Sequence, residues 1–430
     1  MQAILHTGLA DFRQFVNPLV AQRVDLSGEP YRFAGTAEGQ LVGVDGSRIE
    51  DLHGTQAFGH RNSAIAAAVA AFLASDAPNW FPGRVNPFAG TLARQLCERS
   101  GYSSAYFANS GSEAVEAAIK LARAATGRPR IVALGNAYHG CTMGSCALMA
   151  PGVYRDPFAP HLADVALIDR NDIDALERVL ADRQTAAVVV EPIQLEGGVQ
   201  PLGADFIAAL CEATARAGTL LVADEVQTGM GRTGRFLASE TWPRRPDVVT
   251  LGKHLGGGLV PISAMLTQRA WFQAAYGRNF ETSEAHNCTF SGSAIACVAA
   301  LAALELLDAD LMAHVASVGA QFRRDLAGSL AGSPLFDQVR GDGLAIGVAL
   351  HATDHPWLSF DHFGMIDLQG RATIGLLLCQ RLYKRGFFAF VCGHDWRVLR
   401  MQPRFAIEAP QLAGLARVIA EELAILEHLA

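Results

Sequence analysis

Two charged side chains stand at the ends of apolar runs in this sequence. The stretch TLLVADE (219–225) is typical of a buried strand that ends in an acidic pair, and the next apolar run, Val248–Leu251, is followed by Gly252 and Lys253. A carboxylate at the end of a buried strand needs a cation, a metal or water as its partner. If the two strands are neighbours, Asp224 and Lys253 share one crevice, either as a structural ion pair or as two separate chemical tools. Pyridoxal phosphate chemistry needs the second combination, a lysine for a Schiff base and an acid that keeps the pyridine nitrogen protonated.

Small residues at a predicted helix N-terminus indicate a possible phosphate site. The stretch NSGSE (109–113) lies between a strand at 105–107 and a helix over 112–125. Such a terminus presents free backbone N–H groups and the positive end of the helix dipole to an anion, although Ser is also common there as a simple cap. Tyr138, which follows a strand at 131–134, could stack on a cofactor ring or pack in the core.

The elements that must position these residues alternate between helices and apolar strands. Strands apolar on both faces, separated by helices, favour an α/β fold with a mostly parallel sheet flanked by helices. The predicted strands are Ile131–Leu134, Ala186–Val190, Thr219–Ala223 and Val248–Leu251, and the predicted helices are Ala64–Ser75, Ser112–Ala125, Ile173–Arg183 and Asp205–Ala217.

The two flanks of the chain have a different pattern. Residues 31–58 indicate a short meander with an Asp45-Gly46 turn, which is a strong hairpin signal. We expect a large domain over 59–318 and a smaller α+β domain built from both termini, 1–58 and 319–430. A predicted helix at Ala294–Leu307 leads toward the C-terminal part, which is predicted to contain helices at Thr373–Arg385 and Ala409–Leu429 and strands at Leu344–Leu350 and Val398–Met401.

Composition excludes several classes of protein. Of the 430 residues, 50% are hydrophobic and 18% charged, which suits a large core, and the net charge of −7 without a polybasic run argues against nucleic-acid or acidic-membrane partners. Met1–Ala10 has no Lys or Arg, so we expect no export signal, and the longest apolar runs are too short to span a membrane. The eight scattered cysteines lack a CxxC pair, so we predict reduced thiols, a cytoplasmic location and no metal site.

Seven ordered stretches, from about residue 31 to the C-terminus, resemble the class III aminotransferases. These are pyridoxal phosphate enzymes of fold type I, and the motifs are similar to the ornithine and acetylornithine branch. The resemblance therefore implies a fold type I α/β architecture with a seven-stranded sheet in the large domain. The stretches are NSGSEAVEAAIKLAR (109–123), AYHG (137–140), EPIQLEGG (191–198), LLVADEVQTGMGRTG (220–234), LGKHLGGGLVPISAML (251–266), HNCTFSGSAIACVAAL (286–301) and VLRMQPRFAI (398–407).

The resemblance implies roles for residues around a bound pyridoxal phosphate. Lys253 would form the Schiff base and shuttle the substrate proton, while Asp224 would hold the pyridinium. Thr289 would reach the phosphate from a neighbouring subunit, which implies a homodimer with composite active sites. The other implied cofactor contacts are Gln227 at the phenolic oxygen, Val226 on the ring face opposite Tyr138, His139 beside Tyr138, and Ser110, Gly111 and Ser112 at the phosphate.

The resemblance also implies how substrates bind. Glu196 and Arg400 resemble a pair in which Arg binds a substrate α-carboxylate and Glu masks that Arg when the other substrate enters. Phe81 falls near the substrate channel of relatives. We therefore expect a transaminase that moves an amino group from an amino acid or terminal amine to a keto acid, with 2-oxoglutarate as the expected acceptor, by a ping-pong mechanism.

Three departures from the family pattern bear on the substrate. Leu195 replaces a usual Gly, which predicts a narrower pocket floor, and Arg404 in Pro403-Arg404-Phe405 places an extra cation near Arg400. The segment 351–370 is longer than a routine connector and is interpreted as a surface loop, a dimer contact or a substrate lid.

Other functions stay open at this stage. An aminomutase, epimerase or decarboxylase could use the same scaffold, and a non-catalytic interaction protein could retain the fold. The motif GMGRTG (229–234) matches the GxGxxG of nicotinamide-dependent oxidoreductases, but a dinucleotide site needs that motif to open a helix. Residues 235–246 include Trp242-Pro243 and Pro246, which are poor helix material.

Overall fold

The strands that lead to Asp224 and Lys253 are neighbours in one seven-stranded sheet. The computed structural model describes residues 2–21, 33–353, 362–363, 366–367 and 372–428. β12 is antiparallel to both of its neighbours, and the other four pairings of the sheet are parallel, which confirms the predicted mostly parallel sheet. In spatial order the strands are β4 (Ser104–Ala108), β12 (Ser263–Thr267), β11 (Val248–Leu251), β10 (Leu220–Asp224), β7 (Thr185–Val190), β5 (Arg130–Leu134) and β6 (Val165–Ile168).

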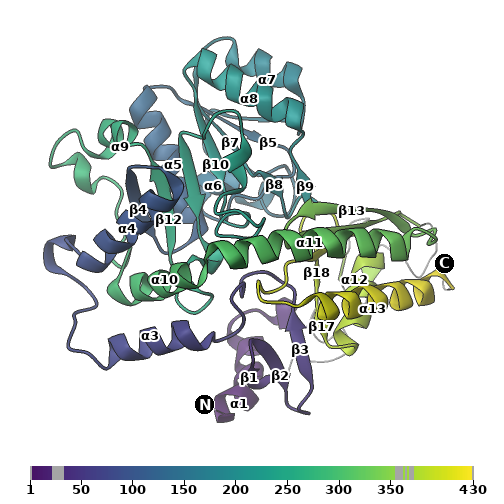
Figure 1. Ribbon diagram of the computed structural model, residues 1–430. Helices are drawn as coiled ribbons and strands as arrows, with labels where there is room; N and C mark the ends of the chain where they lie inside the picture. Colours follow the sequence, from purple (N-terminus) through teal and green to yellow (C-terminus); the bar gives the residue numbers. More distant parts are fainter. Residues whose placement is uncertain (1, 22–32, 354–361, 364–365, 368–371, 429–430) are drawn as a thin grey trace.

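The central part of this sheet is buried on both faces because its strands are apolar at most positions. In β7, Val188 and Val190 pack in one apolar cluster, while Ala187 and Val189 pack in another. Side chains alternate across a strand, so the two clusters lie on opposite faces of the sheet. The surrounding helices, visible in Figure 1, include α5 (Gly111–Thr126), α7 (Ile173–Leu180), α8 (Ala204–Ala217) and α9 (Arg269–Tyr276).

Both ends of the chain build the smaller α+β part, as expected. One sheet has the order β1-β2-β3-β17, so N-terminal strands pair with a C-terminal one, and the predicted Asp45-Gly46 turn joins β2 to β3 with Gly46 at φ 82°. The second sheet has the order β13-β14-β19-β18. The strands are β1 (Phe33–Ala37), β2 (Gln40–Gly43), β3 (Arg48–Asp51), β13 (Phe336–Asp342), β14 (Ala345–Leu350), β17 (Phe387–Phe388), β18 (Phe390–Val391) and β19 (Val398–Met401).

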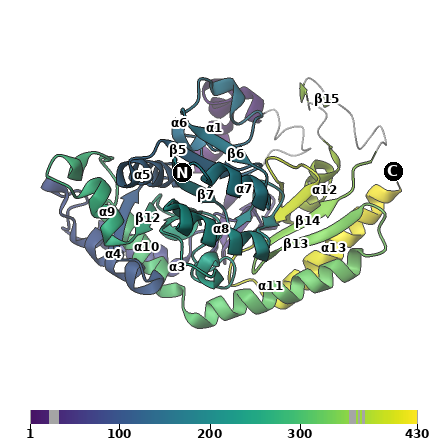
Figure 2. The same ribbon diagram turned by 90° about the horizontal axis from the view of Figure 1, so that it is seen from above.

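Several helices complete the fold. The predicted helices near residues 64, 294, 373 and 409 are present as α3 (Ser63–Leu73), α10 (Ala294–Leu306), α12 (Ile374–Lys384) and α13 (Ala409–Glu427). Sequence patterning missed α1 (Gln2–Phe15), α4 (Pro87–Ser100) and α11 (Ala309–Leu330). Figure 2 shows α11 alongside α13 and β13, and the predicted domain boundary after residue 318 falls within this continuous helix.

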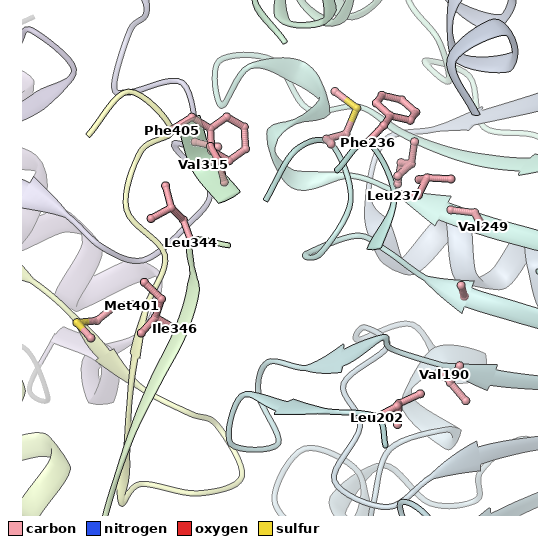
Figure 3. Close-up of a cluster of buried hydrophobic side chains, with 14 of the residues drawn as sticks. Val190, Leu202, Phe236, Leu237, Val249, Val315, Leu344, Ile346, Met401 and Phe405 are labelled. Atoms are coloured by element: carbon pink, nitrogen blue, oxygen red, sulfur yellow. The ribbon is translucent and has the colours of Figure 1, made fainter. Parts of the chain in front are cut away.

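One apolar cluster spans the large and small parts of the molecule. It contains Val190 and Val249 from the large sheet together with Ile346 of β14 and Met401 of β19, as Figure 3 shows. Side chains that share one cluster are removed from water together, so the cluster stabilises the relative position of the two parts. The end of β19 is thereby fixed against the body that carries β10 and β11.

The GMGRTG loop (229–234) has a structural role in this fold. It is followed only by a short 3-10 turn at Ala238–Thr241, so it does not open the helix that a dinucleotide site needs. Arg232 in the loop is fully buried and donates to the carbonyl oxygens of Pro403 (2.5 Å) and Gly54 (3.1 Å). The loop thus joins segments from both termini instead of holding a pyrophosphate.

Candidate active site

Asp224 is fixed at the C-terminal end of β10. Its Oδ2 lies 2.7 Å from His139 Nδ1, and its Oδ1 accepts hydrogen bonds from Thr250 Oγ1 (2.9 Å) and the Val226 backbone N–H (3.2 Å). The residue is 4% exposed. A carboxylate offers about four lone-pair positions, so these contacts orient Asp224 and leave room for a further donor such as a pyridinium N–H.

His139 and Glu191 form the next layer around Asp224. Burial opposes the charged form of His139, but the hydrogen bond and charge of Asp224 outweigh it, so the pKa of His139 is raised. Glu191, which follows β7, accepts the backbone N–H groups of Tyr138 (2.8 Å) and Leu195 (3.4 Å). Burial raises the pKa of Glu191 to about 8. The loop that carries Tyr138 and His139 is therefore held by two buried acids.

Lys253 lies two residues after the end of β11, the strand that pairs with β10, which ends at Asp224. Its φ of 48° is in the left-handed region, which costs about 1–3 kcal/mol for a non-glycine residue and is typical of functional sites. Burial, and then the Arg400 guanidinium, lower the pKa of the Lys253 amine, against the opposing effects of Glu196 and Asp224. A lower pKa increases the neutral fraction of the amine, which is the form that attacks a carbonyl.

The N-terminus of α5 approaches the loop after β10 closely, through Gly111 and Val226. Ser110 caps the helix, with its Oγ accepting the Glu113 N–H (3.3 Å), and Ser112 Oγ accepts the Cys141 N–H (3.0 Å). A Cβ on Gly111 would lie 2.8 Å from Val226 Cγ1, so only glycine allows this close approach. The N–H groups of the first helical turn have no partner within the helix, and the dipole there favours an anion.

Arg400 and Glu196 form the other end of the site. Arg400 Nη1 lies 2.5 Å from Glu196 Oε1, and it also contacts the side-chain oxygens of Gln227 (3.2 Å) and Gln402 (3.4 Å). Glu196 Oε2 accepts the Gly393 N–H at 2.9 Å. Burial acts to raise the pKa of Glu196, but Arg400 outweighs it and the net pKa is lowered. Arg400 Nε is buried and has no hydrogen-bond partner among the described residues, so the guanidinium keeps an unused donor.

Sequence reasoning missed several side chains of this site. Thr250 stands directly opposite Asp224 in the β10–β11 register, and a polar residue in an otherwise apolar strand was an available signal. Tyr154 packs edge-on against both Tyr138 (6.1 Å between ring centroids) and His394 (5.4 Å), and no spacing in the sequence indicates this. Burial, and then the charges of Arg400 and Lys253, lower the pKa of His53 in the N-terminal segment.

Two further predicted residues, Thr289 and Phe81, have neighbours of their own in the single chain. Thr289 is exposed, and the adjacent Cys288 Sγ lies 2.8 Å from Asn109 Nδ2 of the same chain. The Phe81 ring packs near Phe88 of α4, with 6.3 Å between centroids. Among the described residues, neither Thr289 nor Phe81 contacts the Arg400–Glu196 pair.

The departures from the family pattern have structural explanations. Leu195 is fully buried in an apolar cluster with residues of β14 and β19. The Arg404 side chain binds Glu50 (3.0 Å), so the extra cation expected near Arg400 is neutralised by its own partner. Most of the 351–370 segment lies outside the described residues.

The described part of the chain also limits other kinds of site. It contains no group of three or more His, Cys, Asp or Glu residues placed to hold a metal ion. No helix within the described ranges is both long and apolar enough to cross a bilayer.

Comparison with known proteins identifies the family. The model of the family "Aminotransferase class-III" matches residues 28–423. The chain is a class III aminotransferase. Among curated relatives, it is 42% identical to the acetylornithine aminotransferase of Mycobacterium tuberculosis over 345 residues, covering 76% of this chain and 82% of the relative.

Other matches agree with this family. Aminotransferase PigE from Serratia sp. is 36% identical over 349 residues, which cover 80% of this chain but only 41% of PigE. The crystal structure of ornithine aminotransferase from Toxoplasma gondii ME49 superposes with a TM-score of 0.84 at 26% identity, covering 99% of this chain and 96% of that one. This aminotransferase therefore has the fold type I architecture and belongs to a pyridoxal phosphate-dependent class of transaminases.

Proposed function

We propose that this aminotransferase transfers an amino group from an amino acid or terminal amine to a keto acid, with 2-oxoglutarate as acceptor. The observation that carries the proposal is the position of Lys253. Its amine has a pKa lowered first by burial and then by Arg400, while Glu196 and Asp224 act to raise it. One nucleophile is thus close enough to both an acid for the cofactor and a cation for a carboxylate to feel their charges.

Pyridoxal phosphate, when bound, supplies an electron sink for the bond that breaks at the amino carbon. In our proposal Lys253 would hold the aldehyde end of the cofactor and carry the substrate proton, and Asp224 would hold the ring nitrogen in its protonated form. The free acceptor capacity of Asp224 and the close approach of Gly111 to Val226 support this placement. Tyr138 and Val226 would enclose the ring, with His139 behind Asp224, Gln227 at the phenolic oxygen, and Ser110 and Ser112 beside Gly111 at the phosphate.

Arg400 would bind the α-carboxylate of the keto acid, and Glu196 would cover Arg400 during the donor half-reaction. The close Arg400–Glu196 contact and the unpartnered Arg400 Nε support such exchange, because the guanidinium retains a donor for an incoming carboxylate. A planar guanidinium grips a carboxylate through two parallel bonds, which Lys cannot do. Release of one product before the second substrate enters predicts ping-pong kinetics.

A homodimer with composite sites is part of the proposal. Thr289 is exposed in the single chain, as are the next residue, Phe290 (60%), and Phe280 (96%). A dimer interface would remove these apolar side chains from water. In a dimer this surface would be covered, Thr289 would reach a phosphate, and Phe81 would lie near the substrate channel. The free cysteines among the described residues fit the proposed cytoplasmic location.

The test begins with purified protein and added pyridoxal phosphate. Borohydride reduction followed by peptide mapping should give one stable adduct, at Lys253, and amino donors should then be screened against 2-oxoglutarate and pyruvate. An adduct elsewhere would overturn the assigned site. Turnover that needs no keto acid would instead indicate an aminomutase, epimerase or decarboxylase.

A further inference from the structure

His254, the residue directly after Lys253, joins the loop that follows β11 to the loop that follows β10. Its Nε2 lies 2.9 Å from the carbonyl oxygen of Gly229. A carbonyl oxygen can only accept a hydrogen bond, so Nε2 carries the ring proton and donates it. Because β10 and β11 are neighbours in the sheet, this bond connects their two ends beyond the last bonds of the ladder.

The Gly229 carbonyl is a fixed acceptor. The Gly229 N–H donates to Glu225 O (3.0 Å) and so closes a turn that contains Val226 and Gln227. A Cβ on Gly229 would lie 2.7 Å from Leu251 Cδ2 and 2.9 Å from Glu225 O, so the turn fits against β11 only with glycine at this position. A donor that binds this carbonyl is therefore located relative to the end of β10.

The His254 ring is enclosed and uncharged. The residue is 1% exposed, and its ring meets the Phe405 ring edge-on with 5.6 Å between centroids. Burial, and then the Arg232 guanidinium, lower the pKa of His254 to about 3, so the ring is neutral at physiological pH. Among the described residues, Nδ1 has no hydrogen-bond partner. The ring therefore directs its polar contact to Gly229 and places no charge beside Lys253.

The backbone next to His254 is the strained part of this loop. Lys253 has a φ of 48°, which a non-glycine residue keeps only where its surroundings hold it. The backbone bonds of the short turn, Leu255 N–H to Gly252 O (2.9 Å) and Gly257 N–H to His254 O (2.9 Å), stay within the turn itself. The side-chain bond from His254 is the one among these that ties the turn to a different strand end.

We propose that His254 is a positioning residue, whose bond to Gly229 holds the strained Lys253 backbone so that the amine meets the cofactor aldehyde. The inference rests on the proposed function, in which Lys253 holds that end of the cofactor: the amine nitrogen bonds the aldehyde carbon and one water leaves. His254 acts through Lys253 and takes no part in the bond that forms.

The experiment compares two ligands on full-length protein freed of cofactor. One is pyridoxal phosphate, and the other is deoxypyridoxine phosphate, an analogue with a methyl group in place of the aldehyde. Calorimetric titration gives the Kd of each. Only the first ligand can bond Lys253, so the ratio of the two Kd values reports the contribution of the amine separately from that of the ring and phosphate contacts.

Three substitutions of His254 and one control separate the bond from the packing. His254→Gln keeps an amide donor with about the reach of Nε2, His254→Met removes the donor, and His254→Asn has an amide too short to reach Gly229. The matched control is His314→Met on α11, which removes a histidine–carbonyl contact of the same 2.9 Å length, to Ile407, outside the site. Circular dichroism checks the folding of each variant, and if His254→Met does not fold, the Asn and Gln variants provide the comparison.

We expect His254→Met and His254→Asn to raise the Kd of pyridoxal phosphate by about tenfold, as for one lost buried hydrogen bond, and to leave the Kd of deoxypyridoxine phosphate unchanged. His254→Gln should recover most of the affinity, and His314→Met should match the wild type.

Four results would overturn the role of His254. Unchanged affinity for pyridoxal phosphate in the folded Met and Asn variants would show that the bond does not matter. Equal weakening of both ligands would show that His254 supports the loop around the cofactor and not Lys253. A loss in His254→Gln as large as in His254→Asn, or an equal loss in His314→Met, would assign the effect to packing. If the wild type itself binds both ligands equally, the proposed function of Lys253 fails and the role of His254 fails with it.

Discussion

The cofactor end and the substrate end of this site hold their charges in different ways. Asp224 is fixed by hydrogen bonds from His139, Thr250 and the Val226 backbone, all at strand ends or loops of the large sheet. Arg400 is held mainly by one carboxylate, Glu196, which lies on a loop beyond β7 and far away in sequence. The first arrangement resists movement, whereas the second can open by exchanging one carboxylate for another. In the proposed function, Asp224 is the fixed partner of a permanently bound cofactor, and Glu196 is the replaceable partner of an Arg400 that meets a changing ligand.

The same contrast exists between adjacent acids. Glu225, next to Asp224, accepts hydrogen bonds from Ala238 and Ser239 and from the Thr228 hydroxyl. Its side chain therefore fixes the loop after β10 and takes no part in the site. Asp224 and Glu225 are both buried, so burial does not distinguish an acid that fixes a loop from one that can bind a further group. The number of hydrogen bonds that each carboxylate already accepts does distinguish them.

The largest effect should come from removing the group between the two ends. Lys253→Ala is expected to abolish turnover, since no other amine would bond the cofactor aldehyde. Steady-state assays should show this, with circular dichroism and gel filtration confirming a folded protein. Substantial retained activity would exclude the proposed role of Lys253.

Replacing Asp224 by its uncharged amide should strongly reduce activity. Asp224→Asn keeps the size of the side chain but removes its charge, and we expect kcat to fall by about 10²- to 10³-fold, as for the loss of a preorganised electrostatic contact. Because Asp224 raises the pKa of His139, the variant should also lower that pKa, which NMR titration can follow. A kcat near that of the wild type would mean that the ring nitrogen is protonated by another group.

At the substrate end we expect binding to change more than chemistry. Arg400→Ala should raise the KM for 2-oxoglutarate by roughly 10²-fold, which corresponds to a charge-assisted contact of about 3 kcal/mol. Arg400→Lys should recover only part of this loss because it cannot form two parallel bonds. Initial-rate measurements across keto acid concentrations provide the check, and an unchanged KM would assign the carboxylate to another residue.

Neutralising Glu196 should change the KM for 2-oxoglutarate less than the loss of Arg400 does, and in the opposite direction. Glu196→Gln leaves Arg400 without its negative partner, so the KM for 2-oxoglutarate should fall by about two- to fivefold, in line with a modest ion-pair contribution. The KM for an amino donor without a carboxylate should rise instead. If both KM values moved together, Glu196 would not act as a cover for Arg400.

Arg404 offers the sharpest control for Arg400. Arg404→Met should leave the KM for 2-oxoglutarate unchanged, because this guanidinium binds Glu50 and not the site. The free energy of unfolding should fall by about 1–3 kcal/mol as Glu50 loses a charged hydrogen-bond partner. Denaturant unfolding and initial rates measured together would show both results. A raised KM would place Arg404 in substrate binding.

Much of the large sheet and the cofactor end was predictable from short stretches of sequence. Strands such as Val248–Leu251 are apolar except at Thr250, and polar residues directly after such strands had to lie at one edge of a parallel sheet. The N-terminus of α5 was predicted by the same kind of local pattern. These features depend on residues that are close together in the chain. The repeat of apolar residues and the Gly and polar residues that end each element can therefore be recognised in the sequence.

Other features were decided only by tertiary structure. Sequence patterning selected Asp224 but did not show what Glu225 binds, and it did not pair Arg404 with Glu50. The contact between Glu50 and Arg404 joins segments hundreds of residues apart, and it exists because one apolar cluster fixes β14 and β19 against the large sheet. The sequence determined which side chains could carry charge at strand ends. Packing between distant elements decided which of those charges face each other, since burial makes a partner necessary but does not specify its position in the chain.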